Sequence, residues 1–125
     1  MECKSILIVD DSATSRFIIR RCFEMAGFLS AQYYEAEDAL QALSFLQANP
    51  VDLILSDLKM PKMDGKTFIK KLKMKDGTKN IPVVVISSMG NNVTESQLLE
   101  EGAKVIIRKP LSPLKVVEAL GVNQN

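Results

Sequence analysis

Short apolar runs alternate along the chain with longer segments in which apolar residues recur at helical spacing. The short runs are typical of strands, and we expect them at 5–9, 30–36, 52–56, 82–87 and 104–107. The longer segments repeat their apolar residues every three or four positions, which predicts helices at 12–26, 37–48, 65–74, 94–102 and 112–120. The pattern therefore predicts five strand–helix units in a single domain that spans residues 1–125.

Local signals support several of these boundaries. Gly27 is expected to end the first helix, and the sequence TESQ at 94–97 has the form of a capping box that starts the fourth helix. Ser112 followed by Pro113 is typical of the start of a helix. In the helix over 37–48, the pattern places Ala39, Leu40, Leu43 and Leu46 on one buried face.

Strands that alternate with helices predict an α/β fold with a parallel sheet covered on both faces, because right-handed crossovers place helices on each side. Four of the five strand candidates are continuously apolar, as strands buried on both faces should be. A common doubly wound layout of this kind has the strand order 2-1-3-4-5. Ligands of such sheets bind outside the carboxyl ends of the strands.

Polar residues follow the strands at these carboxyl ends. The first strand runs into Asp10 and Asp11, and the third runs into Asp57. The fourth ends at Ser87 and Ser88, and the fifth is followed by Lys109 and Pro110. In the order 2-1-3-4-5 these four strands are neighbours about 4.8 Å apart. We therefore expect three carboxylates, a hydroxyl and an ammonium group in one crevice.

Composition narrows the functions that this crevice can serve. Sixteen basic and fifteen acidic residues leave a net charge of +1, so nothing indicates a nucleic-acid or membrane partner. No apolar run is long enough to span a bilayer, and the start of the chain does not resemble a signal peptide, so we expect a cytoplasmic protein. The chain contains no histidine, which excludes histidine-based catalysis and histidine metal ligands.

Three carboxylates brought together repel one another. At about 5 Å and an effective dielectric constant near 20, each pair costs roughly 3 kcal/mol. The cluster should therefore take up protons or bind a cation, and its oxygen ligands favour Mg²⁺, with Mn²⁺ as an alternative, over zinc. A cation together with Lys109 would suit a phosphoryl group, and a carboxylate can itself accept that group as an aspartyl phosphate.

These residues resemble the receiver domains of two-component response regulators over essentially the whole chain. The sequence ILIVDDSATSRFII (6–19) is similar to the opening of the family, and DLKMPKMDG (57–65) to its phosphoacceptor loop. Ser87 stands where the family has a serine or threonine, and Lys109-Pro110 matches its Lys-Pro pair. The resemblance implies a flavodoxin-like (βα)5 fold, and the chemotaxis-type regulators are the most similar in layout.

The resemblance also implies a role for each residue. Asp57 would accept a phosphoryl group from a phosphohistidine of a sensor histidine kinase or phosphotransfer protein. Asp11, Asp57 and the Lys59 backbone carbonyl would hold Mg²⁺, with Asp10 acting mainly through water. Lys109 would pair with the phosphoryl oxygens, and Ser87 would rotate to bond them. In addition, Pro61 and Gly65 would shape the acceptor loop, Pro110 would follow a cis peptide bond, and Ser88 would lie at the switch.

One position departs from the family pattern. The family often has an aromatic switch residue three positions before the lysine, where this chain has Ile106, and no aromatic residue follows Phe68. We therefore expect a smaller rearrangement, or one that depends on aliphatic packing. The switched surface would be the helix after 94, the strand after 104 and the last helix, and it would bind an unknown downstream protein.

Other functions remain open from the residues. Asp10 and Asp57 could be an ordinary helix cap and strand end, and Ser87 and Lys109 could be ordinary surface groups. An aspartate-nucleophile phosphohydrolase would usually carry its acids two residues apart after the first strand, whereas Asp10 and Asp11 are adjacent. A flavin-binding protein would need a phosphate-binding loop where DDSATSR carries two acids and no glycine. A receiver-like scaffold that never accepts phosphate is disfavoured, because Asp10, Asp11 and Asp57 are all present. We expect a phosphoacceptor without a separate turnover substrate and without an output domain.

Overall fold

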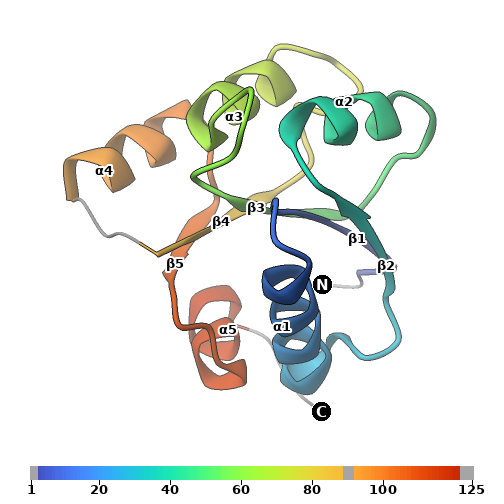
Figure 1. Ribbon diagram of the computed structural model, residues 1–125, viewed down its shortest axis with the longest axis vertical. Coiled ribbons are helices and arrows are strands. Elements are labelled where there is room, and N and C mark those ends of the chain that lie inside the picture. Colours follow the sequence, from blue (N-terminus) through green and yellow to red (C-terminus); the bar gives the residue numbers. More distant parts are fainter. Residues whose placement is uncertain (1–2, 89–91, 122–125) are drawn as a thin grey trace.

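The computed structural model describes residues 3–88 and 92–121. Five parallel strands form one sheet in the order β2-β1-β3-β4-β5, with helices on both faces (Figure 1). The strands are β1 (Ser5–Val9), β2 (Gln32–Ala36), β3 (Leu53–Asp57), β4 (Val83–Ser87) and β5 (Val105–Arg108). The doubly wound α/β fold and its strand order, both expected from the sequence, are confirmed.

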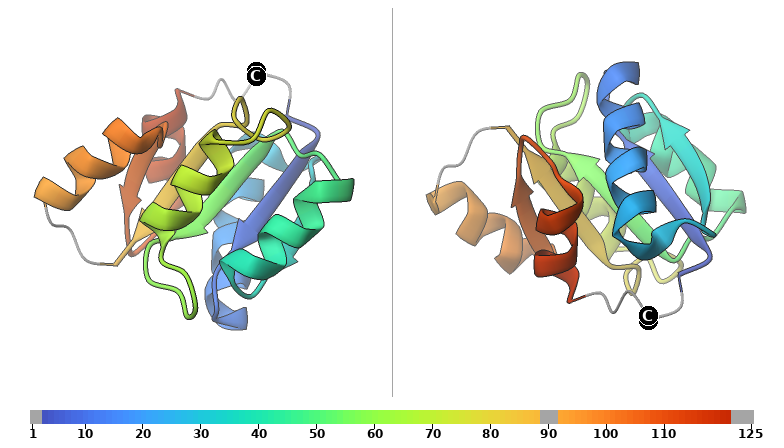
Figure 2. Two further views of the ribbon diagram at one scale, coloured as in Figure 1. Left: turned by 90° about the horizontal axis from the view of Figure 1, so that it is seen from above. Right: turned by 90° about the horizontal axis from the view of Figure 1, so that it is seen from below.

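The helices divide between the two faces of the sheet. Helices α2, α3 and α4 cover one face, whereas α1 and α5 cover the other (Figures 1 and 2). Their bounds are α1 (Ala13–Phe23), α2 (Ala39–Ala48), α3 (Gly65–Lys73), α4 (Asn92–Glu101) and α5 (Pro113–Leu120). Each face has its own hydrophobic cluster, with Phe68 buried in the first and Phe23 in the second. Within the described ranges, no helix is both long and apolar enough to cross a membrane.

The burial of the strands explains why their sequences are so apolar. Every residue of β3 and β4 is buried, and so are four of the five residues of β1. The edge strand β2 is largely exposed, in agreement with its mixed sequence. Along the ladders Val9 is paired with Ser56, and Asp57 with Ile86. This register places the carboxyl ends of β1, β3 and β4 side by side.

Several helix boundaries differ from those expected. Regular helix ends at Phe23, and a wider π-type turn, η1 (Glu24–Phe28), follows and contains Gly27 at φ 117°. Helix α4 begins at Asn92, two residues before the expected capping box. The cap at Ser112 is present as expected, because its side chain accepts a hydrogen bond from the Lys115 amide.

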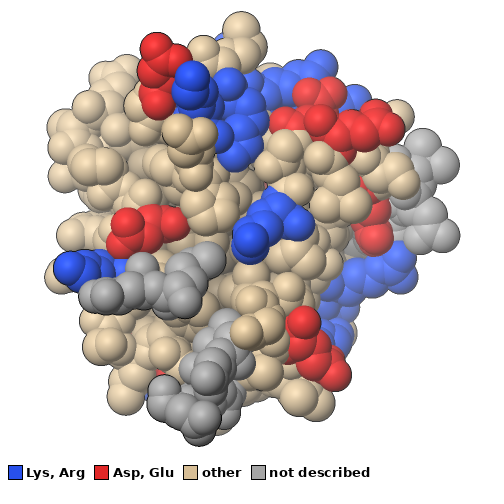
Figure 3. Space-filling model, turned by 180° about the vertical axis from the view of Figure 1, so that it is seen from behind, with Lys and Arg blue, Asp and Glu red and all other residues tan. Residues whose placement is uncertain are grey.

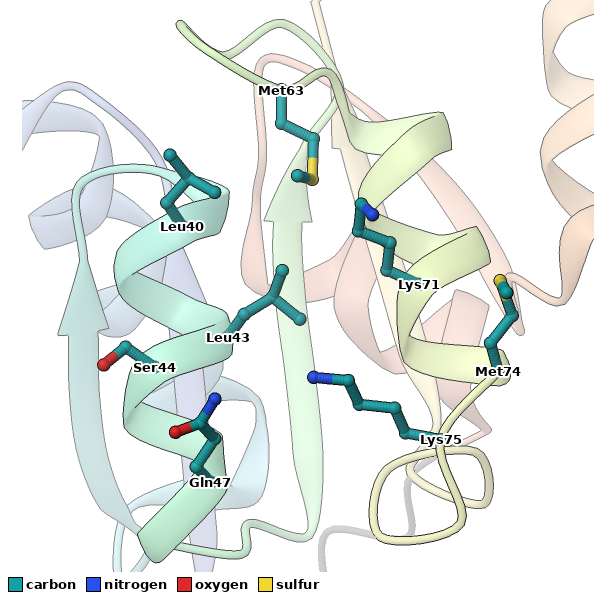
Figure 4. Close-up of a pocket in the computed structure, with 8 residues that line it drawn as sticks. All are labelled: Leu40, Leu43, Ser44, Gln47, Met63, Lys71, Met74 and Lys75. Carbon is teal, nitrogen blue, oxygen red and sulfur yellow. The ribbon is translucent and has the colours of Figure 1, made fainter.

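The buried face of α2 was also assigned partly wrongly. Leu40 is 48% exposed, and the small side chain of Ala42 is buried instead. Ala39, Ala42 and Leu46 form the stripe that faces the sheet. Leu40 and the half-buried Leu43 lie beside that stripe, and Figure 4 shows Leu43 pointing toward α3.

Candidate functional site

Three carboxylates meet at the carboxyl edge of the sheet. Asp10 and Asp11 follow β1, and Asp57 ends the neighbouring strand β3. One oxygen from each of the three lies within 4.8 Å of the others. Asp10 is 1% exposed and Asp57 8%, whereas Asp11 faces solvent. The expected convergence of these side chains is therefore present in the structure.

Both oxygens of Asp10 accept hydrogen bonds from the start of α1. The Ser12 amide donates to Oδ1 at 2.9 Å, and the Ser15 hydroxyl donates to Oδ2 at 2.5 Å. The Asp10 carbonyl accepts a further bond of 2.7 Å from Arg16, whose Nε also bonds Glu35 on β2. Asp10 is therefore held rigidly by the protein, whereas Asp11 is turned toward solvent.

The surroundings of Asp57 disfavour the ionised form of its carboxyl group. Burial raises the pKa of its carboxyl group above the ordinary value, and the negative charge of Asp10 adds to this effect. The nearby Lys109 ammonium and the amides of Leu58 and Lys59 act in the opposite direction. The Leu58 amide donates to Asp57 Oδ1 at 2.7 Å. The carboxylate is thus oriented by the backbone, but its charge is only partly compensated.

Lys109 brings a positive charge to the carboxylates. Its Nζ atom lies 3.1 Å from Ser15 Oγ, 3.5 Å from Asp10 Oδ2 and 3.9 Å from Asp57 Oδ2. Its backbone amide donates to the Ser87 carbonyl at 2.8 Å, which ties the end of β5 to that of β4. The peptide bond between Lys109 and Pro110 is cis, as the resemblance implied. The ammonium group reaches the site from the far side of β4.

The remaining switch residues lie around the same edge. Ser87 is the last residue of β4 and is 3% exposed, whereas Ser88 is exposed. Ser88, Lys109 and Pro110 line a hollow of about 560 Å³ together with the first turns of α1. Ile106 is half-buried on β5 and packs against the cluster below α3 and α4, so an aliphatic side chain fills this position.

The loop between β3 and α3 folds closely over Asp57. The Gly65 amide donates to the Leu58 carbonyl at 2.9 Å, which closes the loop. A Cβ atom on Gly65 would lie 2.8 Å from the Asp57 carbonyl oxygen, so only glycine fits without movement. Pro61 and Lys59 are exposed on this loop, and Lys62 adopts a positive φ of 71°.

The donor set fits a hard divalent cation. The three clustered ligand atoms are all carboxylate oxygens, which suit Mg²⁺ or Mn²⁺ and not softer metals. Burial of Asp57 next to Asp10 creates a negative charge that a cation would neutralise. The cluster is therefore able to hold a metal ion.

The family profile of the response regulator receiver domain matches residues 6–121. The chain belongs to this family. The receiver is 38% identical over 117 residues to the phosphate regulon transcriptional regulatory protein PhoB of Pseudomonas aeruginosa, covering 94% of this chain and 50% of PhoB. It is 30% identical to a probable chemotaxis protein CheY of Rhizobium etli, covering 92% of this chain and 88% of that protein.

Solved structures agree with this assignment. The receiver superposes on the chemotaxis response regulator CheY4 of Vibrio cholerae with a TM-score of 0.82, at 25% identity and with 94% and 95% of the two chains covered. Several relatives are much longer than this receiver, which spans half of PhoB and 29% of the cyclic di-GMP phosphodiesterase response regulator RpfG of Xanthomonas campestris. Receiver domains of two-component systems thus occur alone and joined to other domains.

Two residues of the receiver site were missed from the sequence. Ser15 joins the Asp10 carboxylate to the Lys109 ammonium, and Arg16 holds the Asp10 backbone. Ser15 is half-buried in the first turn of α1. The sequence signal that could have identified them is their position in the first turn of a helix directly after an acidic pair, because groups at the start of a helix commonly bind a preceding carboxylate.

Proposed function

We propose that the receiver accepts a phosphoryl group on Asp57 from a phosphohistidine of a sensor histidine kinase or phosphotransfer protein, in a Mg²⁺-dependent reaction that Mn²⁺ also supports. The observation that carries this proposal is the position of the Asp57 carboxylate, beside two further carboxylates and 3.9 Å from the Lys109 ammonium. A nucleophilic carboxylate, a cation-binding cluster and a nearby positive charge are groups that phosphoryl transfer uses.

The chemistry follows from these groups. An Asp57 carboxylate oxygen attacks the phosphorus atom, the new O–P bond forms, and the P–N bond to the donor imidazole breaks with its electron pair remaining on nitrogen. The Leu58 amide fixes the orientation of the attacking carboxylate. Lys109 turns from Asp10 and Ser15 to the arriving phosphoryl oxygens. A bound Mg²⁺, held by Asp11, Asp57 and the Lys59 carbonyl, would neutralise charge on those oxygens.

We further propose that this modification changes a protein-binding surface on α4, β5 and α5. Ser87 ends β4 one position after Ile86, the ladder partner of Asp57, and its hydroxyl is the group proposed to respond to a new phosphoryl group. With Ile106 in place of an aromatic residue, the response passes through aliphatic packing against the core. The proposed binding partner of this surface is a downstream protein in the cytoplasm, and neither a nucleic acid nor a membrane.

The test is Mg²⁺-dependent labelling with acetyl phosphate, detected by intact-protein mass spectrometry. We expect one phosphoryl group on the wild type, none on Asp57→Ala, and wild-type labelling of Asp76→Ala, whose carboxylate is 98% exposed and far along the chain from the site. Replacing Mg²⁺ with a chelator should abolish labelling. Equal labelling of wild type and Asp57→Ala would assign the acceptor to another residue.

A further inference from the structure

A groove of about 550 Å³ lies between α2 and α3, away from the acidic cluster. Leu40, Leu43, Met63 and Met74 supply its apolar lining, and Leu40 and Met74 are 48% and 82% exposed. Figure 4 shows Leu43 pointing from α2 toward α3, with Met63 above it at the carboxyl end of β3. Exposed leucine and methionine around a hollow are typical of a protein-binding surface.

Two lysines, Lys71 and Lys75, give this groove a positive charge. Both are exposed on the α3 side, and Figure 4 shows the Lys75 side chain reaching across toward α2. None of the described residues that line the groove is acidic. Among the described residues, neither lysine forms an ion pair or a side-chain hydrogen bond.

Three nearby lysines, Lys70, Lys73 and Lys79, are neutralised or occupied by the protein itself. Lys70 pairs with Glu101 of α4, and Lys79 pairs with Asp76. The Lys73 ammonium donates to the carbonyls of Lys79 and Ile81, at 3.1 and 2.9 Å. Lys71 and Lys75, which line the groove, have no such partner among the described residues, so their positive charges are available to a ligand.

The surrounding sequence strengthens this positive charge. Residues 59–79 contain eight of the sixteen basic residues and only two of the fifteen acidic ones, although the whole chain is nearly neutral. On the face opposite to that of Figure 1, several basic side chains gather at the top, on the side of the sheet that carries α3 (Figure 3). An anionic partner would thus be attracted to this side of the molecule.

We propose that the α2–α3 groove binds an amphipathic helix of a partner protein, with apolar residues entering the groove and acidic residues meeting Lys71 and Lys75. From Leu40 to Gln47 the groove follows α2 for about 10 Å, the length of two helical turns. An occupying helix therefore contributes apolar residues one turn apart, at positions i and i+3 or i+4, as in other helix-in-groove complexes.

The shape of the site favours this occupant over nucleic acid or an anionic membrane. Nucleic acid offers phosphates for the lysines but little that would fill a hollow lined with leucine and methionine. A membrane surface is engaged by apolar side chains that protrude from a convex face, whereas Leu43 and Met63 line a recess. An acidic helix matches both the charge and the concavity.

The proposal can be tested without any phosphodonor, so that its failure would be separate from a failure of phosphorylation at Asp57. A display library of helical peptides of about twelve residues, with no overall charge bias, is selected on the wild type and counter-selected on Lys71→Glu/Lys75→Glu. We expect discriminating peptides that carry paired apolar residues one turn apart and an excess of acids. They should bind the wild type about tenfold more tightly than the double variant.

Matched variants identify the surface. Lys104→Glu reverses an exposed lysine outside the groove and should leave peptide affinity at the wild-type value. Leu40→Ser and Met74→Ser change exposed side chains, so the variants should fold while binding is weakened. The proposal would be overturned if no peptide distinguished the wild type from the double variant. It would also be overturned if the peptides that do so were basic or lacked the paired apolar residues. The proposal would also be overturned if anionic vesicles or duplex DNA bound the receiver with the same dependence on Lys71 and Lys75 while the acidic peptides did not bind.

Discussion

Gly65 provides a sharp test of how closely the acceptor loop packs on Asp57. A methyl group at this position would lie 2.8 Å from the Asp57 carbonyl oxygen and 3.0 Å from Leu58 Cα. Both neighbours are backbone atoms, so relief of the contact requires movement of the acceptor strand or of α3. Overpacking of this kind costs about 1–3 kcal/mol, which outweighs the gain in helix propensity of at most about 1 kcal/mol from replacing glycine.

The assay is urea unfolding of Gly65→Ala, followed by circular dichroism, with Gly77→Ala as the matched control. No atom lies within 4 Å of the corresponding position at Gly77, and its φ is not in the left-handed region. Gly77→Ala should therefore be neutral or more stable by about 0.4–1 kcal/mol. Gly65→Ala should lower the free energy of unfolding by about 1–3 kcal/mol and slow labelling of Asp57. Wild-type stability and labelling in Gly65→Ala would refute the packing described here.

Three further predictions concern charge and burial. Burial raises the pKa of Asp57 in the folded protein above its ordinary value of 3.8. In the metal-free protein the protonated carboxyl group therefore contributes fully to the free energy of unfolding below pH 3.8, and this contribution is lost as the pH rises through the raised pKa. In urea titrations the unfolding free energy of Asp57→Asn should not show this fall with rising pH, and Mg²⁺ should no longer stabilise the variant. A fall identical to that of the wild type would show that ionisation of Asp57 is not its cause. Arg16→Ala should lower the free energy of unfolding by about 1.5–3 kcal/mol, whereas the exposed Arg21→Ala should change it by less than about 0.5 kcal/mol. Burial and the Asp52 charge raise the pKa of Cys3 to about 11, so at pH 7 iodoacetamide should alkylate Cys3 far more slowly in the folded than in the unfolded protein, and equal rates by mass spectrometry would count against it.

The strand order and the meeting of Asp10, Asp11 and Asp57 could be predicted because few physical solutions were available. Continuously apolar strands such as β3 and β4 must be buried on both faces, which requires a parallel sheet with helices on each side. Polar residues that end neighbouring parallel strands must then share one edge. The convergence at Asp57 follows from topology and needs no knowledge of side-chain conformation.

Other features depended on packing that periodicity does not encode. The pattern in α2 allowed either Leu40 or Ala42 to face the sheet, and the smaller side chain is the one that is buried. Ser15 and Arg16 read as ordinary helix residues, since their contacts with Lys109 and Glu35 join segments far apart in the chain. The π-type turn around Gly27 likewise replaces the last regular turn that spacing alone predicts.

The place of β3 at the centre of the sheet has a mechanical consequence. Asp57 ends a strand that is bonded on both sides and buried throughout, so chemistry there occurs at the stiffest part of the domain. At the sheet edge, β5 has four residues, is paired with β4 alone within the described sheet, and is only partly buried. By these measures β5, like the other edge strand β2, is more compliant than β3, so a disturbance at Asp57 should displace the edges of the sheet more than its centre. Amide hydrogens of β3 should accordingly exchange later than those of β5.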